Sequence, residues 1–146
     1  MADFTLQALH DEIEADSMTI GYKESNGDWK GDQVIADLIN DSANGATIQR
    51  SHVSPQEIIE QIAIEDWDTI SASDRLYMQL LPSLETISTV TNGTEVRNNL
   101  LDIFTAEMVT RDNMIAVVQR QGSRAEVLWG ENAFVTIGDV ARAANL

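Results

Sequence analysis

Apolar residues recur every three or four positions along most of this chain, with polar residues between them. This spacing gathers the apolar side chains on one face of a helix, so it predicts about seven short amphipathic helices around a core. The stripes are Leu6, Leu9 and Ile13; Val34, Ile35, Leu38 and Ile39; Ile58, Ile59, Ile62 and Ile64; Leu76, Tyr77, Leu80 and Leu81; Leu84, Ile87 and Val90; Val96, Leu100, Leu101, Ile103 and Phe104; and Met114, Ile115, Val117 and Val118.

Polar and glycine-containing segments separate these stripes. Asp3 or Thr5 supplies a cap for the first helix, because its side-chain oxygen can accept an otherwise unpaired backbone N–H. Residues 16–30 contain Gly21 and Gly27 and are followed by Gly31, so they predict a loop, and residues 92–93 (Asn-Gly) break the chain again. Residues 46–53 favour a short strand. At most one short two-stranded β element is therefore expected.

Two further helix boundaries are signalled in the middle of the chain. Ser54 offers a hydroxyl cap, Pro55 occupies the first helical position and Glu57 the third, which together form a capping box. Residues 73–74 (Ser-Asp) open another helix, and Pro82 ends or kinks it because proline has no backbone N–H.

Residues 123–146 carry a start or stop signal at every junction. Residues 121–123 (Gln-Gly-Ser) are predicted to end one helix and to cap the next, which Gly130 closes. Thr136 and Asp139 then form a capping arrangement for the final helix, with Asp in place of the usual Glu or Gln.

The chain as a whole fits one domain. Its 146 residues are long enough to bury a substantial core, and neither a linker nor an internal repeat divides residues 1–146. Cysteine is absent, so disulfides and thiolate metal sites are excluded. The first residues lack the pattern of a signal peptide, and no apolar run approaches 18 residues. The predicted fold is an all-α, compact bundle forming a single acidic helical domain, with no membrane partner.

Acidic residues dominate the charge, and they are unevenly spread. The net charge is −15; residues 1–75 hold 16 acids and four bases, whereas residues 76–146 hold eight acids and five bases. Such an excess repels phosphates, so direct binding of nucleic acid is not expected. Three interpretations remain open: a solubilising face, a surface that docks onto a basic partner, and a mimic of DNA charge.

No pattern in the chain predicts catalysis. Asp66 and Asp68 flank Trp67, but the glycine and the terminal acid of a calcium loop are missing, so a solvated turn is expected there. His10 and His52 lie far apart and outside metal-binding spacing. Phosphate-binding loops and a nucleophile elbow are also missing. We therefore predict a protein that is not an enzyme, with no catalytic residues, no cofactor and no metal.

Large aromatic residues are the candidates for contact with a partner. Trp29 lies in a polar loop, while Trp67 and Trp129 have apolar neighbours that favour packing. Tryptophan is also enriched at binding hot spots. The candidate partner contacts are Trp29, Trp129 and Phe134.

Both ends of the chain carry a resemblance. Residues 123–143 (SRAE, then Leu128, Gly130 and VT, then DVARA) resemble the end of a family of small proteins encoded among the structural genes of tailed bacteriophages. Residues 21–22 (Gly-Tyr) and 37–40 (Asp-Leu-Ile-Asn) are similar to the family's opening, and residues 72–75 match more loosely. The family carries no catalytic motif.

The resemblance implies a virion component. The leading hypothesis is a bacteriophage structural or virion-associated protein that packs against other virion proteins, through self-association or in many copies, after assembly in the host cytoplasm. The second is a phage-encoded acidic effector that binds a host protein. The third is an enzyme without a recognisable motif.

Overall fold

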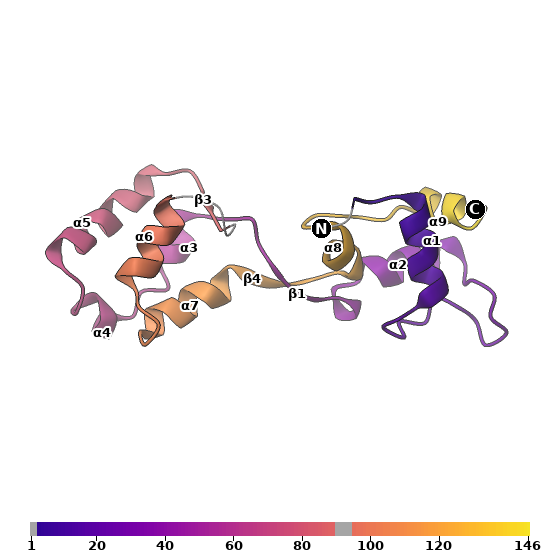
Figure 1. Ribbon diagram of the computed structural model, residues 1–146, viewed down its shortest axis with the longest axis horizontal. Coiled ribbons are helices and arrows are strands. Elements are labelled where there is room, and N and C mark those ends of the chain that lie inside the picture. Colours follow the sequence, from indigo (N-terminus) through magenta and orange to yellow (C-terminus); the bar gives the residue numbers. More distant parts are fainter. Residues whose placement is uncertain (1–2, 90–94) are drawn as a thin grey trace. The chain divides into compact units, whose positions relative to one another are not determined.

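The structure is a computed structural model that describes residues 3–89 and 95–146 (Figure 1). The described ranges contain nine α-helices and two short 3-10 helices, so the predicted helical class is confirmed, with nine helices instead of about seven. The α-helices are α1 (Leu6–Ala15), α2 (Asp32–Asn40), α3 (Pro55–Ile59), α4 (Ile64–Trp67), α5 (Ala72–Leu80), α6 (Glu95–Ile103), α7 (Val109–Val117), α8 (Arg124–Trp129) and α9 (Ile137–Ala143), and the 3-10 helices are η1 (Ser42–Asn44) and η2 (Leu81–Ser83).

Four short strands form two two-stranded sheets in the described part, which is one sheet more than predicted. The strands are β1 (Ala46–Gln49), β2 (His52–Val53), β3 (Ile87–Ser88) and β4 (Gln119–Gly122). β1 pairs with β4, and β2 pairs with β3 in antiparallel register. A lone bridge also joins Lys23 to Trp29.

Two of these strands lie where the sequence predicted helix. Ile87 has the spacing of a helical stripe, but it pairs with Val53 in β2, and the Thr89 N–H donates to the Ser51 carbonyl at 2.9 Å. Val90 and the break at residues 92–93 lie outside the described residues. Residues 119–122 form β4 and follow the end of α7 at Val117, so the helix predicted to end at residues 121–123 stops earlier. Pairing with a distant strand overrides local spacing in both places.

The described residues cluster into two compact units, where the sequence predicted one domain over residues 1–146. Unit 1 consists of residues 1–48 and 121–146, and unit 2 of residues 49–120. The chain passes between them twice, in β1 and in β4, which pair with each other. Each unit has its own hydrophobic core.

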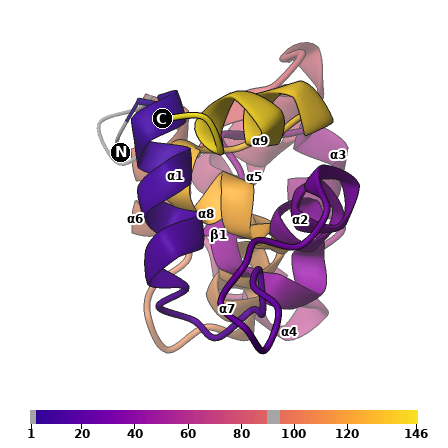
Figure 2. The ribbon, with the colours of Figure 1, turned by 90° about the vertical axis from the view of Figure 1, so that its right-hand side faces the viewer.

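Unit 1 contains α1, α2, α8 and α9 (Figure 2). α9 packs against both α1 and α2, and α2 also packs against α8, so the two ends of the chain share one core. Its buried residues are Leu9, Ile13, Tyr22, Ile35, Ala36, Ile39, Ala125, Val135, Val140 and Ala143. Val34 is 46% exposed, contrary to its place in the predicted stripe, because it lies on the flank of α2 away from this core.

Most predicted caps of unit 1 are present. Thr5 caps α1 by accepting the Ala8 N–H, and Ser123 and Thr136 head capping boxes at α8 and α9. Gly130 closes α8 with a φ of +109°, a conformation that glycine adopts without steric cost. Asp16 ends α1, and its carboxylate accepts the backbone N–H groups of the loop that follows.

Unit 2 is built from α3 to α7 with the β2–β3 sheet. Its core comprises Val53, Ile58, Ile70, Met78, Leu81, Ile87, Leu100, Phe104 and Met114. The capping box of Ser54 and Glu57 is present at α3 as predicted. Ile64, predicted to be buried, is 71% exposed, because α3 stops at Ile59 and Ile64 begins the separate helix α4. Ile115 is likewise exposed on α7.

Within the described residues, every helix is too short or too polar to cross a bilayer.

Candidate functional site

Phe134 is the most exposed of the three aromatic residues singled out in the sequence. Its side chain is 70% exposed, although the next residue, Val135, is fully buried. The Asn40 side chain holds the backbone at this point from both sides: it donates to the Val135 carbonyl at 2.7 Å and accepts the Val135 N–H at 3.0 Å. The aromatic ring is therefore presented to solvent from a fixed backbone.

The start of α9 adds further restraint beside Phe134. The Asp139 carboxylate accepts the Thr136 N–H at 2.9 Å, and the Thr136 hydroxyl accepts the Asp139 N–H at 3.1 Å. Burial by itself raises the pKa of Asp139, but hydrogen bonds from Thr136 and the neighbouring Arg142 outweigh it and lower that pKa below its ordinary value. Ile137, at the first turn of α9, is 47% exposed and is a second exposed apolar residue within three positions of Phe134.

Trp129 and Trp29 lie at the edge of the unit 1 core. Both are half-buried and pack against that core. The Trp129 ring meets the partly exposed Phe4 ring edge to face, with centroids 5.0 Å apart. The Trp29 indole N–H donates to Glu14 at 2.5 Å, and its ring lies 5.5 Å from that of His10. Partner contact through either tryptophan stays a prediction, and both have a packing role as well.

The Glu14 carboxylate organises the exposed side of this loop. Hydrogen bonds from Lys23, at 2.6 Å, and from Trp29 lower the pKa of Glu14 below its ordinary value. The Trp29 ring is thereby held against α1 and is less free to turn toward a partner than the Phe134 ring, which has no ring contact among the described residues.

A buried ion pair joins the two chain ends of unit 1. Arg124 donates through two nitrogens to the two carboxylate oxygens of Glu12, at 2.7 and 2.9 Å, and the two side chains are only 12% and 9% exposed. The Glu12 carboxylate also raises the pKa of Arg124. Tyr22 is fully buried; burial and the charge of Glu12 raise the pKa of its hydroxyl. This network is a structural tie between α1 and α8.

Asp66 has a structural role that the sequence did not suggest. A solvated turn was predicted, but Asp66 is 8% exposed and accepts the backbone N–H of Thr110 in the first turn of α7 at 2.7 Å. The Thr110 hydroxyl in turn accepts the Ala63 N–H at 2.9 Å. Asp66 thus caps a helix that lies more than forty residues away in sequence. No cluster of three metal-ligating side chains occurs in residues 3–89 and 95–146.

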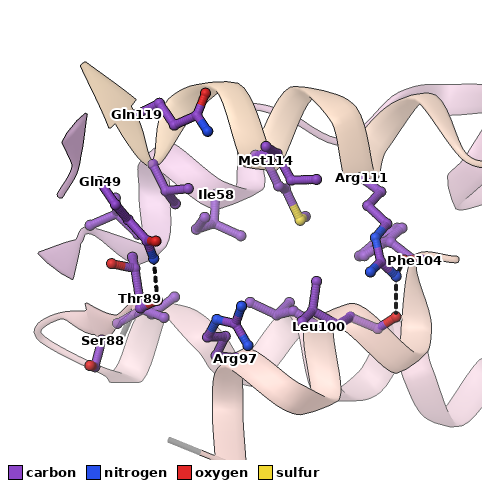
Figure 3. Close-up of a pocket in the computed structure, with 15 residues that line it drawn as sticks. Gln49, Ile58, Ser88, Thr89, Arg97, Leu100, Phe104, Arg111, Met114 and Gln119 are labelled. Atoms are coloured by element: carbon purple, nitrogen blue, oxygen red, sulfur yellow. Dashed lines mark hydrogen bonds between the residues drawn. The ribbon is translucent and has the colours of Figure 1, made fainter. Parts of the chain in front are cut away.

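A cavity of about 170 Å³ opens in unit 2 between α6 and α7 (Figure 3). Its walls are mainly apolar, with Val53, Ile58, Leu100, Phe104 and Met114 among the residues that face it. None of the described residues that line the cavity is acidic. In a chain with 24 acidic residues this composition is a local exception.

Two arginines are the charged groups among the described residues that line the cavity. Arg97 extends from α6 toward the open space, and Arg111 extends from α7 (Figure 3). Arg111 donates to the carbonyls of Leu101 and Phe104 at 3.0 and 3.2 Å. At the other end of the cavity, the Gln49 side-chain amide donates to the Thr89 carbonyl. These residues carry no signal in the sequence, because the segments that line the cavity lie up to seventy positions apart and match no motif.

Comparison with known proteins adds no relative: no family model, no curated protein and no solved structure matches this chain.

Glu57 makes the stability of unit 2 depend on pH. Hydrogen bonds from Arg50, at 2.7 Å, and from the Ser54 backbone and hydroxyl lower the pKa of Glu57 to about 2, from 4.5 in an unpaired carboxyl. A lowered pKa means that the stabilisation is present above pH 4.5 and is lost as pH falls toward 2. We expect the free energy of unfolding at pH 7 to be about 1 kcal/mol higher for the wild type than for Glu57→Gln. The difference is this small because the ion pair of Arg50 and Glu57 is partly exposed to solvent.

Urea unfolding of both proteins between pH 7 and pH 2 measures this difference. The gap between them should close across the acid range, because protonated Glu57 and glutamine both lack the charge that pairs with Arg50. A gap that stays constant with pH would show that the Arg50 pair does not set the pKa of Glu57.

Proposed function

We propose that the protein is a non-enzymatic structural or virion-associated protein of a tailed bacteriophage, and that it packs against other virion subunits through unit 1. The observation that carries the proposal is the exposure of Phe134 next to a backbone that Asn40 holds in place, with Ile137 also exposed three residues later. The resemblance of residues 123–143 to phage proteins supplies the context, and the same residues build this surface. Assembly takes place in the host cytoplasm, and the protein then remains in the particle.

Phe134 has the properties of a binding anchor. Aromatic residues dominate the energetics of protein interfaces, because one ring buries a large apolar area. A ring on a fixed backbone also loses little conformational entropy when it docks, so more of the contact energy is retained as affinity. The Asn40 clamp and the Thr136–Asp139 capping box provide that fixed backbone.

A particle lattice makes such a small surface sufficient. Each copy needs only a small contact area. Once some contacts in a lattice have formed, they raise the effective concentration of the groups that form the next contact, so many weak contacts add up to stable assembly. The acid excess of unit 1, with 13 acidic and four basic residues in residues 1–48 and 121–146, suits a partner surface with basic residues around an apolar pocket.

Incorporation into particles tests this proposal. In phage genomes carrying Phe134→Ser, we expect the amount of this protein in gradient-purified particles to fall at least about tenfold, as for loss of an interface hot spot. Quantitative mass spectrometry against a major capsid or tail subunit gives the measurement. Met18→Ser is the matched control, since Met18 is another exposed apolar residue of unit 1, at 57%.

Two results would overturn the proposal. Absence of the wild-type protein from purified particles would exclude a virion component. If the wild-type protein were instead a soluble monomer that captured one host protein from a lysate, in a manner weakened by salt, the acidic effector would be the better explanation. Normal incorporation of the Phe134→Ser variant would remove Phe134 as the anchor.

A further inference from the structure

The cavity of unit 2 combines apolar walls with an unpaired positive charge. Leu100, Phe104 and Met114 offer surface for the apolar part of a ligand, and Arg97 offers a guanidinium for an anionic part. We propose that the cavity binds a small carboxylate with an apolar body, of the size of benzoate, and that Arg97 pairs with its carboxylate. This site is separate from the Phe134 surface of unit 1 and does not depend on the proposed function.

Arg97 is exceptional among the arginines of the chain. Arg50, Arg124 and Arg142 pair with carboxylates, and the other arginines also have partners. Within residues 3–89 and 95–146, Arg97 is the only arginine without a hydrogen bond or ion pair. Acids outnumber bases by 24 to nine, so a carboxylate partner would be easy to supply from the chain itself. Arg97 is half-buried and faces an apolar cavity, yet no carboxylate of the described residues pairs with it. Such an arginine favours the binding of an anion from outside the chain.

Arg111 and Gln49 complete the polar lining. Two carbonyls hold Arg111 through a single nitrogen, so its position is fixed while its other N–H groups remain for a further acceptor. Gln49 is likewise anchored through its amide nitrogen. A carboxylate accepts several hydrogen bonds and carries a negative charge. Because the charged groups among the described lining residues are both cationic, the cavity should bind a carboxylate in preference to a neutral or cationic ligand.

The size of the cavity favours a small molecule over a peptide or a drug-sized ligand. Its volume is about 170 Å³. An apolar cavity of about 150 Å³ is large enough for benzene, whereas sites for drug-sized ligands occupy roughly 300–1,000 Å³. One ring or a short branched chain therefore fits the apolar part, with the carboxylate directed toward Arg97.

Titration with sodium benzoate, followed by amide and methyl NMR shifts of the full chain, tests the site. We expect saturable shifts that centre on residues lining the cavity, such as Leu100 and Met114. Arg97→Gln should weaken binding by about tenfold or more, in line with loss of a charge-assisted hydrogen bond. Arg97→Lys should weaken it less, because the charge is kept but the two-pronged geometry is lost.

Two controls distinguish specific binding in the cavity from non-specific attraction of benzoate to positive charge or to apolar surface. Lys30→Gln removes the same charge from unit 1, and Lys30 does not line the cavity, so its benzoate affinity should equal that of wild type. Benzyl alcohol has the same ring without the carboxylate and should bind at least about tenfold more weakly. Unchanged spectra of Arg97→Gln outside the cavity confirm that this variant is folded.

The proposal is overturned by any of three results. Benzoate shifts that are absent, or that centre away from the cavity, would show that no such site exists. Equal affinity for benzoate and benzyl alcohol would show an apolar hole without anion selectivity. Equal weakening by Arg97→Gln and Lys30→Gln would assign the binding to net charge alone.

Discussion

Replacing Arg124 by methionine is expected to lower the free energy of unfolding by about 3–5 kcal/mol, because it leaves the Glu12 carboxylate buried without a counter-ion. Methionine keeps much of the length of the arginine side chain, so the effect measures the lost charge more than lost packing. Glu12 is 9% exposed, and both of its oxygens accept hydrogen bonds from Arg124. Urea unfolding at pH 7, monitored by circular dichroism, gives the value.

Two other variants define what this result means. Arg142→Met removes an ion pair whose arginine is 66% exposed, and it should cost about 1 kcal/mol or less. A double variant, Glu12→Leu with Arg124→Met, should recover most of the lost stability, because an apolar pair often replaces a buried ion pair without loss. If Arg124→Met cost no more than Arg142→Met, the Glu12 pair would not be a principal tie of unit 1.

Gly45→Ala is the second substitution with a large expected effect. A Cβ atom at Gly45 would lie 1.8 Å from the Gly122 carbonyl oxygen and 2.6 Å from the Ser123 carbonyl carbon. Both are backbone atoms, so no side chain can rotate away to make room. We expect a loss of about 3 kcal/mol or more in the free energy of unfolding, with weakened β1–β4 pairing. Thermal and urea unfolding measure the loss.

The same substitution at Gly138 provides the matched control. Gly138 lies inside α9, and a Cβ there would meet no atom closer than the Thr136 hydroxyl at 3.8 Å. Alanine is the better helix former, so Gly138→Ala should stabilise the protein by about 0.5–1 kcal/mol. Opposite signs for the two variants are the expected outcome. A mild effect of Gly45→Ala would mean that the two backbone segments separate easily.

Local chemistry made the helices of this chain predictable. Thr5, Ser54, Ser123 and Thr136 all cap helices as their side chains and spacing indicated, since a cap needs only residues within one turn. Gly130 ends α8 for an equally local reason. These features depend on neighbours in sequence, which a single chain displays directly.

The missed features depend on distant partners. Ile87 has helical spacing but becomes a strand because Val53 lies beside it, and Asp66 is buried because Thr110 presents a backbone N–H. No local pattern encodes either pairing. The two compact units also have no local signal, because their boundaries fall in β1 and β4, which contain no linker-like composition.

The candidate sites show the same contrast. Phe134 could be found, because an aromatic residue next to a strong helix start is visible in the sequence. Its clamp could not, since Asn40 lies 95 positions earlier. The cavity of unit 2 is lined by residues from β1, β2, α3, β3, α6, α7 and β4 and has no signature in any one of them.

The division of unit 1 between the two ends of the chain has a consequence for synthesis. At roughly 5–20 residues per second, α1 and α2 leave the ribosome on the order of 5–20 s before α9, against which both pack. During that interval Leu9 and Ile13 have no α9 to cover them, whereas unit 2 is contiguous and has all its residues before α9 is made. Unit 1 is therefore the last part to close, and its open apolar faces are where the newly made chain is most exposed to aggregation or chaperone binding.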